Sequence, residues 1–222
     1  MQETRPPEHE QASIVLVGSF NPKIFQPAWF ASQGLIRQEE ADEANVQVLN
    51  NDICVFETGW FAIESVNDRW MLLSRATPAL ESLRDLALGT FSILRHDPVY
   101  KIGLNAYAHY TMPNRATLDN FGHAIAPKDD VWRPVLDDPR LLSLAINGNR
   151  TDGHVGAVRT KIEPSSKIPD GLFIDVNDEY VNNTESNSAE WALDLLGGEW
   201  ENHRSRVASI REHVVSKAWG MQ

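Results

Sequence analysis

The sequence predicts an α+β protein in which antiparallel strands are covered on one face by helices. Two groups of short apolar segments, each divided by residues typical of turns, predict two meanders of strands. A long stretch of helical periodicity near the C-terminus predicts a long terminal helix. These observations together favour one or more antiparallel sheets built from two meanders, with helices packed on one side.

The first half is expected to open with a strand over 13–19 and a short helix over 27–34, with a proline in its first turn. The acidic run 38–43 should be a surface loop or a frayed helix. A helix over 77–94, with Thr77 as its N-cap, should then cover one face of the sheet. Between these elements lie the four strand-like segments of the first meander, 46–49, 53–58, 60–66 and 70–75.

Residues 99–111 alternate between two kinds of side chain, which predicts a long strand with two distinct sides. The apolar side should pack against the helices. The other side is expected to face a polar space and carries Lys101, Asn105, Tyr107 and His109.

The rest of the chain predicts a loose segment, a second meander and a helical C-terminus. The segment 113–138 contains a helix near 116–126 and is a candidate linker or lid. Adjacent glycines at 197 and 198 favour a helix stop, so we expect two terminal helices, 188–196 and 199–219. The second meander covers 141–147, 154–163 and 171–178.

These elements predict one α+β domain over residues 12–222, with residues 1–11 disordered. The domain would consist of two halves, about 12–112 and 139–222, joined by the loose segment 113–138. The lone Cys54 cannot form a disulfide within the chain, which agrees with a reducing compartment.

The composition restricts the partners that we expect. A formal net charge of −11 argues against nucleic acid as a partner and favours a basic protein surface, although solubility alone is an alternative role for the charge. No apolar run reaches the roughly 18 residues of a membrane span, and the N-terminus lacks the pattern of a signal peptide. We therefore expect a cytoplasmic protein that does not bind membranes.

The motif Gly18-Ser19-Phe20-Asn21-Pro22 resembles the opening of several nucleotidylyltransferases. A strand that leads through glycine to a helix could bind phosphate on its backbone N–H groups. However, the histidines that follow the motif in those enzymes are missing here. The alternative interpretation is a turn that redirects the chain between a strand and a helix.

The sequence does not indicate a metal or a cofactor. The seven histidines never pair at helical spacing, and no second cysteine is present. The acidic stretch 175–179 begins like a calcium loop but has Tyr180 where the loop needs glycine. We therefore predict no metal site and no cofactor.

The polar side of the sheet is the place where chemically able groups could converge. Across neighbouring strands, an imidazole, a phenol, a guanidinium and a carboxylate could support acid–base chemistry or the binding of a small anionic ligand. The alternative is a solvated sheet face with charge pairs. The candidate residues are His109 as general base or ligand donor, Tyr107 and Asn105 as hydrogen-bonding groups, Arg159 as anion clamp and Asp175 as orienting carboxylate.

A protein interface is a second possibility for the surface. Trp132 lies in a proline-flanked loop and is the tryptophan that we expect to be most exposed, and tryptophan is enriched at interface hot spots. The last helix is basic within an acidic protein, so Arg206 and His213 are further candidates for interface residues.

The strand Tyr100-Lys101-Ile102-Gly103-Leu104 and the final Lys217-Ala218-Trp219-Gly220 resemble an uncharacterised, sporadically distributed bacterial family. Asn105 stands where that family has an arginine, so no functional residue is carried over. The resemblance implies an α+β fold and an accessory role, such as defence or toxin neutralisation. Together with the acidic charge, it leads us to expect a non-catalytic protein-binding module. The alternative is an enzyme or a sensor of a small ligand, such as an anion or nucleotide, that uses the polar sheet face.

Overall fold

The computed structural model describes residues 5–75, 80–184 and 186–220. The first half of the chain contains β1 (His9–Gly18), α1 (Pro27–Ser32), α2 (Gln38–Asp42), β2 (Asn45–Leu49), β3 (Ile53–Glu57), β4 (Phe61–Val66), β5 (Arg69–Ser74) and α3 (Leu80–Ile93). The second half contains β6 (Val99–Tyr110), α4 (Arg115–Ile125), β7 (Leu144–Asn149), β8 (Gly156–Pro164), β9 (Leu172–Val181) and α5 (Ala189–Trp219).

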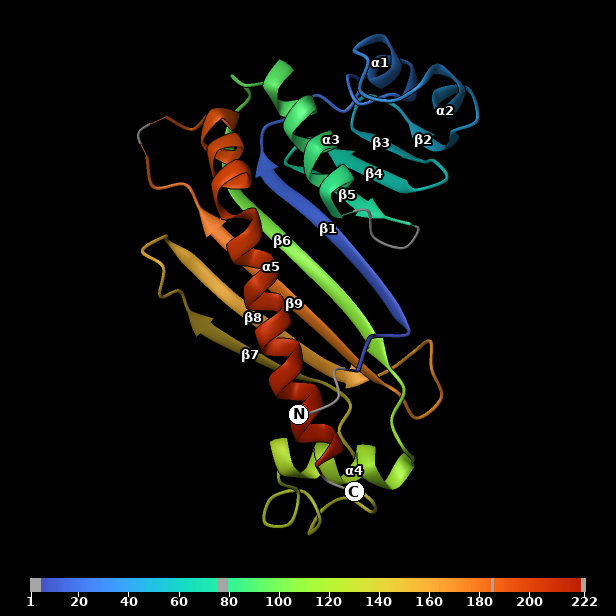
Figure 1. Cartoon of the computed structure of the whole chain (residues 1–222), viewed down its shortest axis with the longest axis vertical. Coiled ribbons are helices and arrows are strands. Elements are labelled where there is room, and N and C mark those ends of the chain that lie inside the picture. The colour runs from blue at the N-terminus through green and yellow to red at the C-terminus, as the bar shows by residue number, and fades with distance from the viewer. Residues whose placement is uncertain (1–4, 76–79, 185, 221–222) are drawn as a thin grey trace.

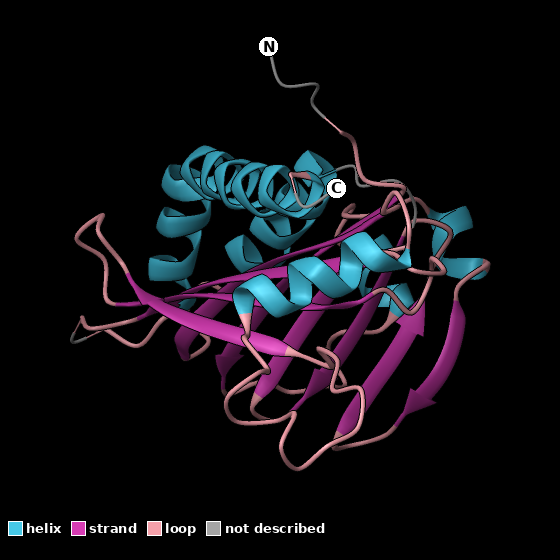
Figure 2. Cartoon of the chain, turned by 90° about the horizontal axis from the view of Figure 1, so that it is seen from below, coloured by secondary structure: helices cyan, strands magenta, loops and turns pink. Residues whose placement is uncertain are grey.

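The strands form one antiparallel sheet, which confirms the predicted α+β class. Within the described residues the sheet has nine strands in the order β2-β3-β4-β5-β1-β6-β9-β8-β7. Helix α5 crosses the sheet diagonally beside α3 (Figure 1). The helices gather on one side of the sheet (Figure 2). We call this side the helix face and the opposite side the open face.

The two halves of the chain have a similar path about the central pair of β1 and β6, with four further strands beside β1 and three beside β6. Each half begins with a central strand, passes through two helices in the first half or one in the second into a meander that returns to that strand, and ends in a helix (Figure 1). The central pair is long, with register from His9↔His109 to Gly18↔Val99. In this topology β6 opens the second half, whereas the sequence analysis grouped residues 99–112 with the first.

The two edge strands, β2 and β7, are mostly exposed. The pairing of β2 with β3 shifts register between Val46 and Val48, which places a bulge on that edge. At the other edge, β7 ends in Asn147-Gly148-Asn149.

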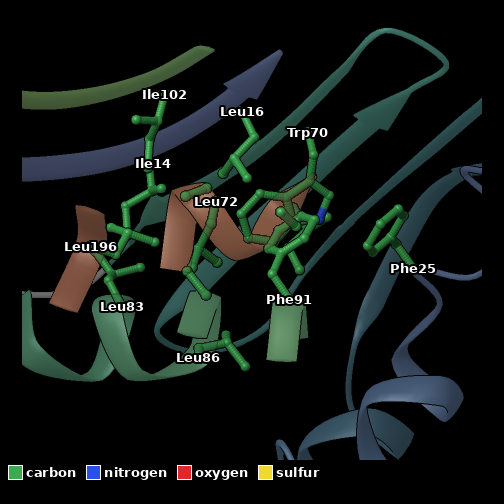
Figure 3. Close-up of a cluster of buried hydrophobic side chains, with 14 of the residues drawn as sticks. Ile14, Leu16, Phe25, Trp70, Leu72, Leu83, Leu86, Phe91, Ile102 and Leu196 are labelled. Atoms are coloured by element: carbon green, nitrogen blue, oxygen red, sulfur yellow. The ribbon is translucent and has the colours of Figure 1, made fainter. Parts of the chain in front are cut away.

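The larger hydrophobic cluster lies between the sheet, mainly its first half, and α3 together with the first turns of α5 (Figure 3). Ile14 and Leu16 of β1 point from the sheet toward this layer, and Leu83 comes from α3. The rings of Trp70 and Phe91 meet almost at right angles, with centroids 4.9 Å apart. Burial of each such side chain contributes about 1.5–3 kcal/mol, so this layer fixes α3 on the sheet.

A second hydrophobic cluster lies under the later turns of α5 and also includes α4. It contains Ala106, Ile174, Val207 and Ala218 among its buried residues. The helix face is not apolar throughout, because buried polar and charged side chains from β9 and α5 lie near the junction of the two clusters. These are Asp178, His203 and Arg211.

Helix α5 continues through Gly197 and Gly198, so the predicted division into two terminal helices is wrong. The two glycines have open space where side chains would lie, and each costs about 1 kcal/mol relative to alanine. Leu196, just before the two glycines, and Trp200, just after them, are both buried. We attribute the unbroken helix to this packing, which outweighs the weak local preference of the glycines.

Strand β1 begins at His9, four residues before the expected start, because residues 9–12 pair with β6. The expectation of disorder therefore does not hold for residues 9–11, and residues 1–4 lie outside the described part of the chain. The predicted N-cap Thr77 also lies outside it. Among the described residues, no helix is both long and apolar enough to cross a membrane.

Candidate functional site

On the open face, the four neighbouring strands β1, β6, β9 and β8 carry polar side chains. Period-two alternation along β1, β6, β8 and β9 directs every second residue to this face. One row across the sheet is Ser13, Asn105, Asn177 and Arg159, and the next is Gln11, Tyr107, Asp175 and Lys161. The strand register thus places Asn105, Tyr107, Arg159 and Asp175 in adjacent positions.

Hydrogen bonds connect the first of these rows to the second. Asn105 Nδ2 donates to Ser13 Oγ at 3.0 Å, and Asn177 Nδ2 donates to Asn105 Oδ1. The Tyr107 hydroxyl lies 3.1 Å from the same Ser13 Oγ. Burial raises the pKa of Tyr107, so its phenol stays protonated and can donate.

A hollow of about 480 Å³ lies over these rows. Five residues were predicted as a site on this face. Four of them line the hollow, namely Asn105, Tyr107, Arg159 and Asp175. Lys101, Lys161, Asn177 and Glu179 also contribute to its walls.

His109 lies apart from the other candidates, in a neighbouring hollow of about 450 Å³ that shares Tyr107 with the first. Its Nδ1 is 2.8 Å from Ser165 Oγ, and its ring centroid is 4.7 Å from that of Phe173. Burial and the nearby Lys167 and His9 lower the pKa of His109, which favours a neutral imidazole. His109 therefore does not share one cavity with Asp175, as a general base working with that carboxylate would.

The cations of the open face are largely neutralised by neighbouring carboxylates. Arg159 donates to both carboxylate oxygens of Glu179, at 3.1 and 3.3 Å, and to Asn147 at 3.2 Å. Lys161 lies 3.3 Å from Glu163. Arg159, the predicted anion clamp, is thus already engaged in a bidentate pair.

Asp175 differs from its neighbours, because its Oδ1 atom is buried and has no hydrogen-bond partner among the described residues. Burial raises the pKa of Asp175 and Glu163 adds to the effect, while Lys161 opposes it. The Oδ1 atom of Asp175 thus has unused hydrogen-bonding capacity, but it is closed off from solvent beside the hollow.

Sequence reasoning missed a buried ion network on the helix face. Asp178 is fully buried and accepts hydrogen bonds from Arg150 and Arg206, with His203 Nδ1 at 3.2 Å. Arg206 Nη2 also donates to Asp152 at 2.7 Å. We call Arg150, Asp152, Asp178, His203 and Arg206 the Asp178 network.

The partners within this network are the reason that its carboxylates stay ionised. Burial alone would raise the pKa of Asp178, but His203 and the two guanidiniums outweigh it and lower that pKa. Asp152 behaves alike, and the hydrogen bonds from Arg150 and the His154 backbone hold its pKa at about 2. A signal was available in the sequence, since Asp178 interrupts the apolar side of an otherwise alternating strand.

The predicted interface residues have different surroundings. Arg206 belongs to the Asp178 network, so its guanidinium is occupied within the chain. His213 lies on the exposed side of α5, with Nδ1 3.0 Å from the Ser209 carbonyl oxygen. Trp132 is 50% exposed, whereas the other six tryptophans are buried or partly buried.

Trp132 belongs to an exposed apolar group in the segment after α4, which lies beyond the end of the sheet (Figure 1). Leu142 is 85% exposed and Val135 is 73% exposed. We call this group the apolar segment, and it consists of Val131, Trp132, Val135, Leu136 and Leu142.

The N-terminal motif forms a turn in which three backbone N–H groups are already bonded within the chain. The backbone N–H groups of Gly18, Ser19 and Phe20 donate to the carbonyls of Asp68, Pro98 and Asn67. A side chain at Gly18 would lie 2.1 Å from the Pro98 carbonyl oxygen, so this close approach requires glycine. The geometry thus supports the interpretation of the motif as a strand-to-helix turn.

Among the described residues, no three histidine, cysteine, aspartate or glutamate side chains group closely enough to hold a metal ion. In comparisons with known proteins, neither a protein family nor a curated protein matches this chain. The resemblance to the sporadically distributed bacterial family therefore stays a prediction.

Proposed function

We propose that this protein binds another protein and that the apolar segment is its contact surface. The observation that carries the proposal is the exposure of five large apolar side chains within twelve residues, 131–142. Exposed apolar groups of this kind mark interaction sites in soluble proteins. Trp132 would be the anchor, because tryptophan dominates interface hot spots.

Local hydrogen bonds order the first part of the apolar segment, up to Leu136. Lys128 Nζ donates to the last carbonyls of α4, at Gly122 and Ala126. The backbone N–H of Trp132 donates to Lys128, and that of Leu136 donates to Trp132 at 2.8 Å. A preorganised loop loses less conformational entropy on binding than a flexible one does.

The charges around the segment indicate the chemistry of the partner. Arg133 pairs with Asp129 at 2.8 Å, and Arg140 pairs with Asp138 at 2.7 Å. Two further carboxylates, Asp130 and Asp137, have no ion-pair partner among the described residues. The partner would therefore offer an apolar groove with a basic rim, in agreement with the net charge of −11.

The open face supports binding better than catalysis. Arg159 and Lys161 are paired with Glu179 and Glu163, and His109 lies in a different hollow from Asp175. The weak family resemblance further suggests that the partner belongs to a bacterial defence or toxin-neutralising system.

The proposal is tested by comparing partners captured by the wild-type protein with those captured by the double variant Trp132→Ser/Val135→Ser. Val155→Ser is the matched control, because Val155 is also exposed but lies outside the segment. We expect one stoichiometric partner whose affinity falls at least about thirtyfold in the double variant and is unchanged in the control. Binding should also weaken at high salt. Equal capture by all three proteins would contradict the proposal, as would a purified protein that is dimeric through this segment.

A second candidate function is the binding of a small polar ligand in the hollow of the open face. The free Oδ1 atom of Asp175 favours a ligand that donates hydrogen bonds, such as a polyol or an amine, over the anion expected from the sequence. A ligand that binds the folded protein raises its melting temperature. We expect polyols or amines to do so in the wild type but not in Asp175→Asn. A shift caused by nucleotides alone would favour the anion instead.

A further inference from the structure

A separate hollow of about 220 Å³ lies on the helix face, between α5 and the central strands β1 and β6. It occurs where the two hydrophobic clusters meet. Leu104 and Trp200 of the first cluster line it, together with Ala106 and Val207 of the second. Seven of the fourteen residues that line the hollow are polar or charged, among them Glu10, His203, Arg204 and Arg211.

Arg211 is the most unusual of these polar groups, because it is only 8% exposed and lines the hollow with part of its guanidinium unpaired. Its Nη1 atom donates to Glu10. Its Nε and Nη2 atoms are buried and have no hydrogen-bond partner among the described residues. These two atoms form one edge of the guanidinium, and such an edge binds both oxygens of a carboxylate.

Trp200 supplies a third unpaired donor. It lies about three turns before Arg211 on the same side of α5, and its buried Nε1 also has no partner among the described residues. An indole N–H donates and never accepts. A buried donor without a partner costs free energy of folding, so a ligand that supplies a hydrogen-bond acceptor here would stabilise the folded protein.

The geometry points to a small aliphatic carboxylate as the ligand of this hollow. Both donor atoms are closed off from solvent, so the Arg211 side chain would turn toward the hollow for a carboxylate to accept from its Nε and Nη2 atoms. The alkyl chain of the ligand would then lie against Leu104 and Val207. The volume is below the roughly 300–1,000 Å³ of pockets for drug-sized ligands, which favours a short chain. Glu10 on the same guanidinium disfavours a dianion such as phosphate, because like charges repel.

This site is independent of the apolar segment, and NMR spectroscopy of the indole N–H groups can test it directly. The seven tryptophans each give one indole signal, and the variant Trp200→Phe identifies that of Trp200. Sodium butyrate and sodium hexanoate are the probes, with butyramide, phosphate and chloride at equal ionic strength as controls. We expect the two carboxylates to shift the Trp200 signal in a saturable manner and to raise the melting temperature.

Variants of the arginine then identify the binding group. Arg211→Lys keeps the charge but removes the bidentate edge, and should weaken butyrate binding at least about tenfold. Arg84→Gln is the matched control, because Arg84 is a paired arginine, 2.7 Å from Asp85, that lies outside the hollow. Its affinity for butyrate should stay within about twofold of the wild type.

Three outcomes would overturn the inference. They are the absence of any saturable change with butyrate or hexanoate in the wild type, an equal response to butyramide, and unchanged affinity in Arg211→Lys. The first two outcomes are measured on the wild-type protein alone. The inference can therefore be refuted even if a variant fails to fold. A failure here would leave the proposed protein-binding function unaffected, because that function depends on Trp132.

Discussion

Asp175 and Asp178 lie three residues apart on β9, yet they face opposite sides of the sheet and have opposite electrostatic surroundings. Burial acts on both carboxylates in the same direction, by raising the pKa. On the helix face, Asp178 has three partners that reverse this effect. On the open face, Asp175 keeps one oxygen without a partner, and its pKa stays raised.

The difference teaches that the partners of a buried charge, more than its depth, distinguish scaffold from site. A carboxylate with all its hydrogen bonds made inside the chain joins elements together, as Asp178 does for β9, α5 and the loop that carries Arg150. A carboxylate with a free oxygen retains the capacity to bind something else. Substitutions at Asp178, Asp152 and Asp175 should therefore have effects of different size and sign.

The largest effect is expected from Asp178→Ala, which would leave the guanidiniums of Arg150 and Arg206 without their shared carboxylate. Removal of one member of a buried ion pair costs about 3–5 kcal/mol of unfolding free energy. Urea unfolding at pH 7 measures this loss. Asp85→Ala is the control, since Asp85 is 61% exposed and should change stability by no more than about 0.5 kcal/mol. A loss below about 1 kcal/mol in Asp178→Ala would refute the scaffold role.

An intermediate effect is expected from acid. The pKa of Asp152 falls from its ordinary 3.8 to about 2 in the folded protein, which corresponds to about 2 kcal/mol. Because the folded-state pKa is below the unfolded-state pKa, this stabilisation is complete above about pH 4 and is lost as the pH falls toward 2. Asp152→Asn should therefore be less stable than wild type at pH 6 and lose less stability on acidification. Parallel pH profiles of the two proteins would contradict this expectation.

The smallest effect is expected from Asp175→Asn, which removes a charge that burial disfavours. Because the folded-state pKa of Asp175 is raised, its charge destabilises the protein above that pKa, and the penalty disappears as the pH falls below the unfolded-state pKa. We expect the variant to be more stable than wild type at pH 7 by up to about 1 kcal/mol, with no difference near pH 3. Destabilisation at pH 7 would show instead that the ionised Asp175 is a structural group like Asp178.

The fold was predictable because it depends on local patterns. Asparagine and glycine turns divided the first meander into its four strands, and the alternation in β6 separated Ile102 from Asn105 and Tyr107 correctly. The unbroken α5 was not predictable from Gly197 and Gly198, because the packing of residues distant in sequence decides there.

The candidate sites were predictable only in part. The alternation placed Asn105, Tyr107 and Asp175 on one face, but it carries no information on which charges pair across strands, as Arg159 and Glu179 do. The buried positions of His203 and Arg211 follow from their spacing with Trp200 and Val207 on α5. The spacing placed His203 on the apolar stripe correctly, whereas the charge of Arg211 hid its buried position, because charged residues are seldom expected in a core.

The bulge between Val46 and Val48 has a consequence for the protein at high concentration. An exposed edge strand is a template on which a second chain can add and so start an aggregate. The bulge breaks the regular spacing of backbone groups along β2, so an incoming strand cannot form a continuous ladder there. At the far edge, Asn147-Gly148-Asn149 offers few of the branched apolar residues that promote such addition. The bulge on β2 and the polar end of β7 thus limit strand addition at the two edges, where Val46 and Ile146 are exposed, while the apolar segment stays available.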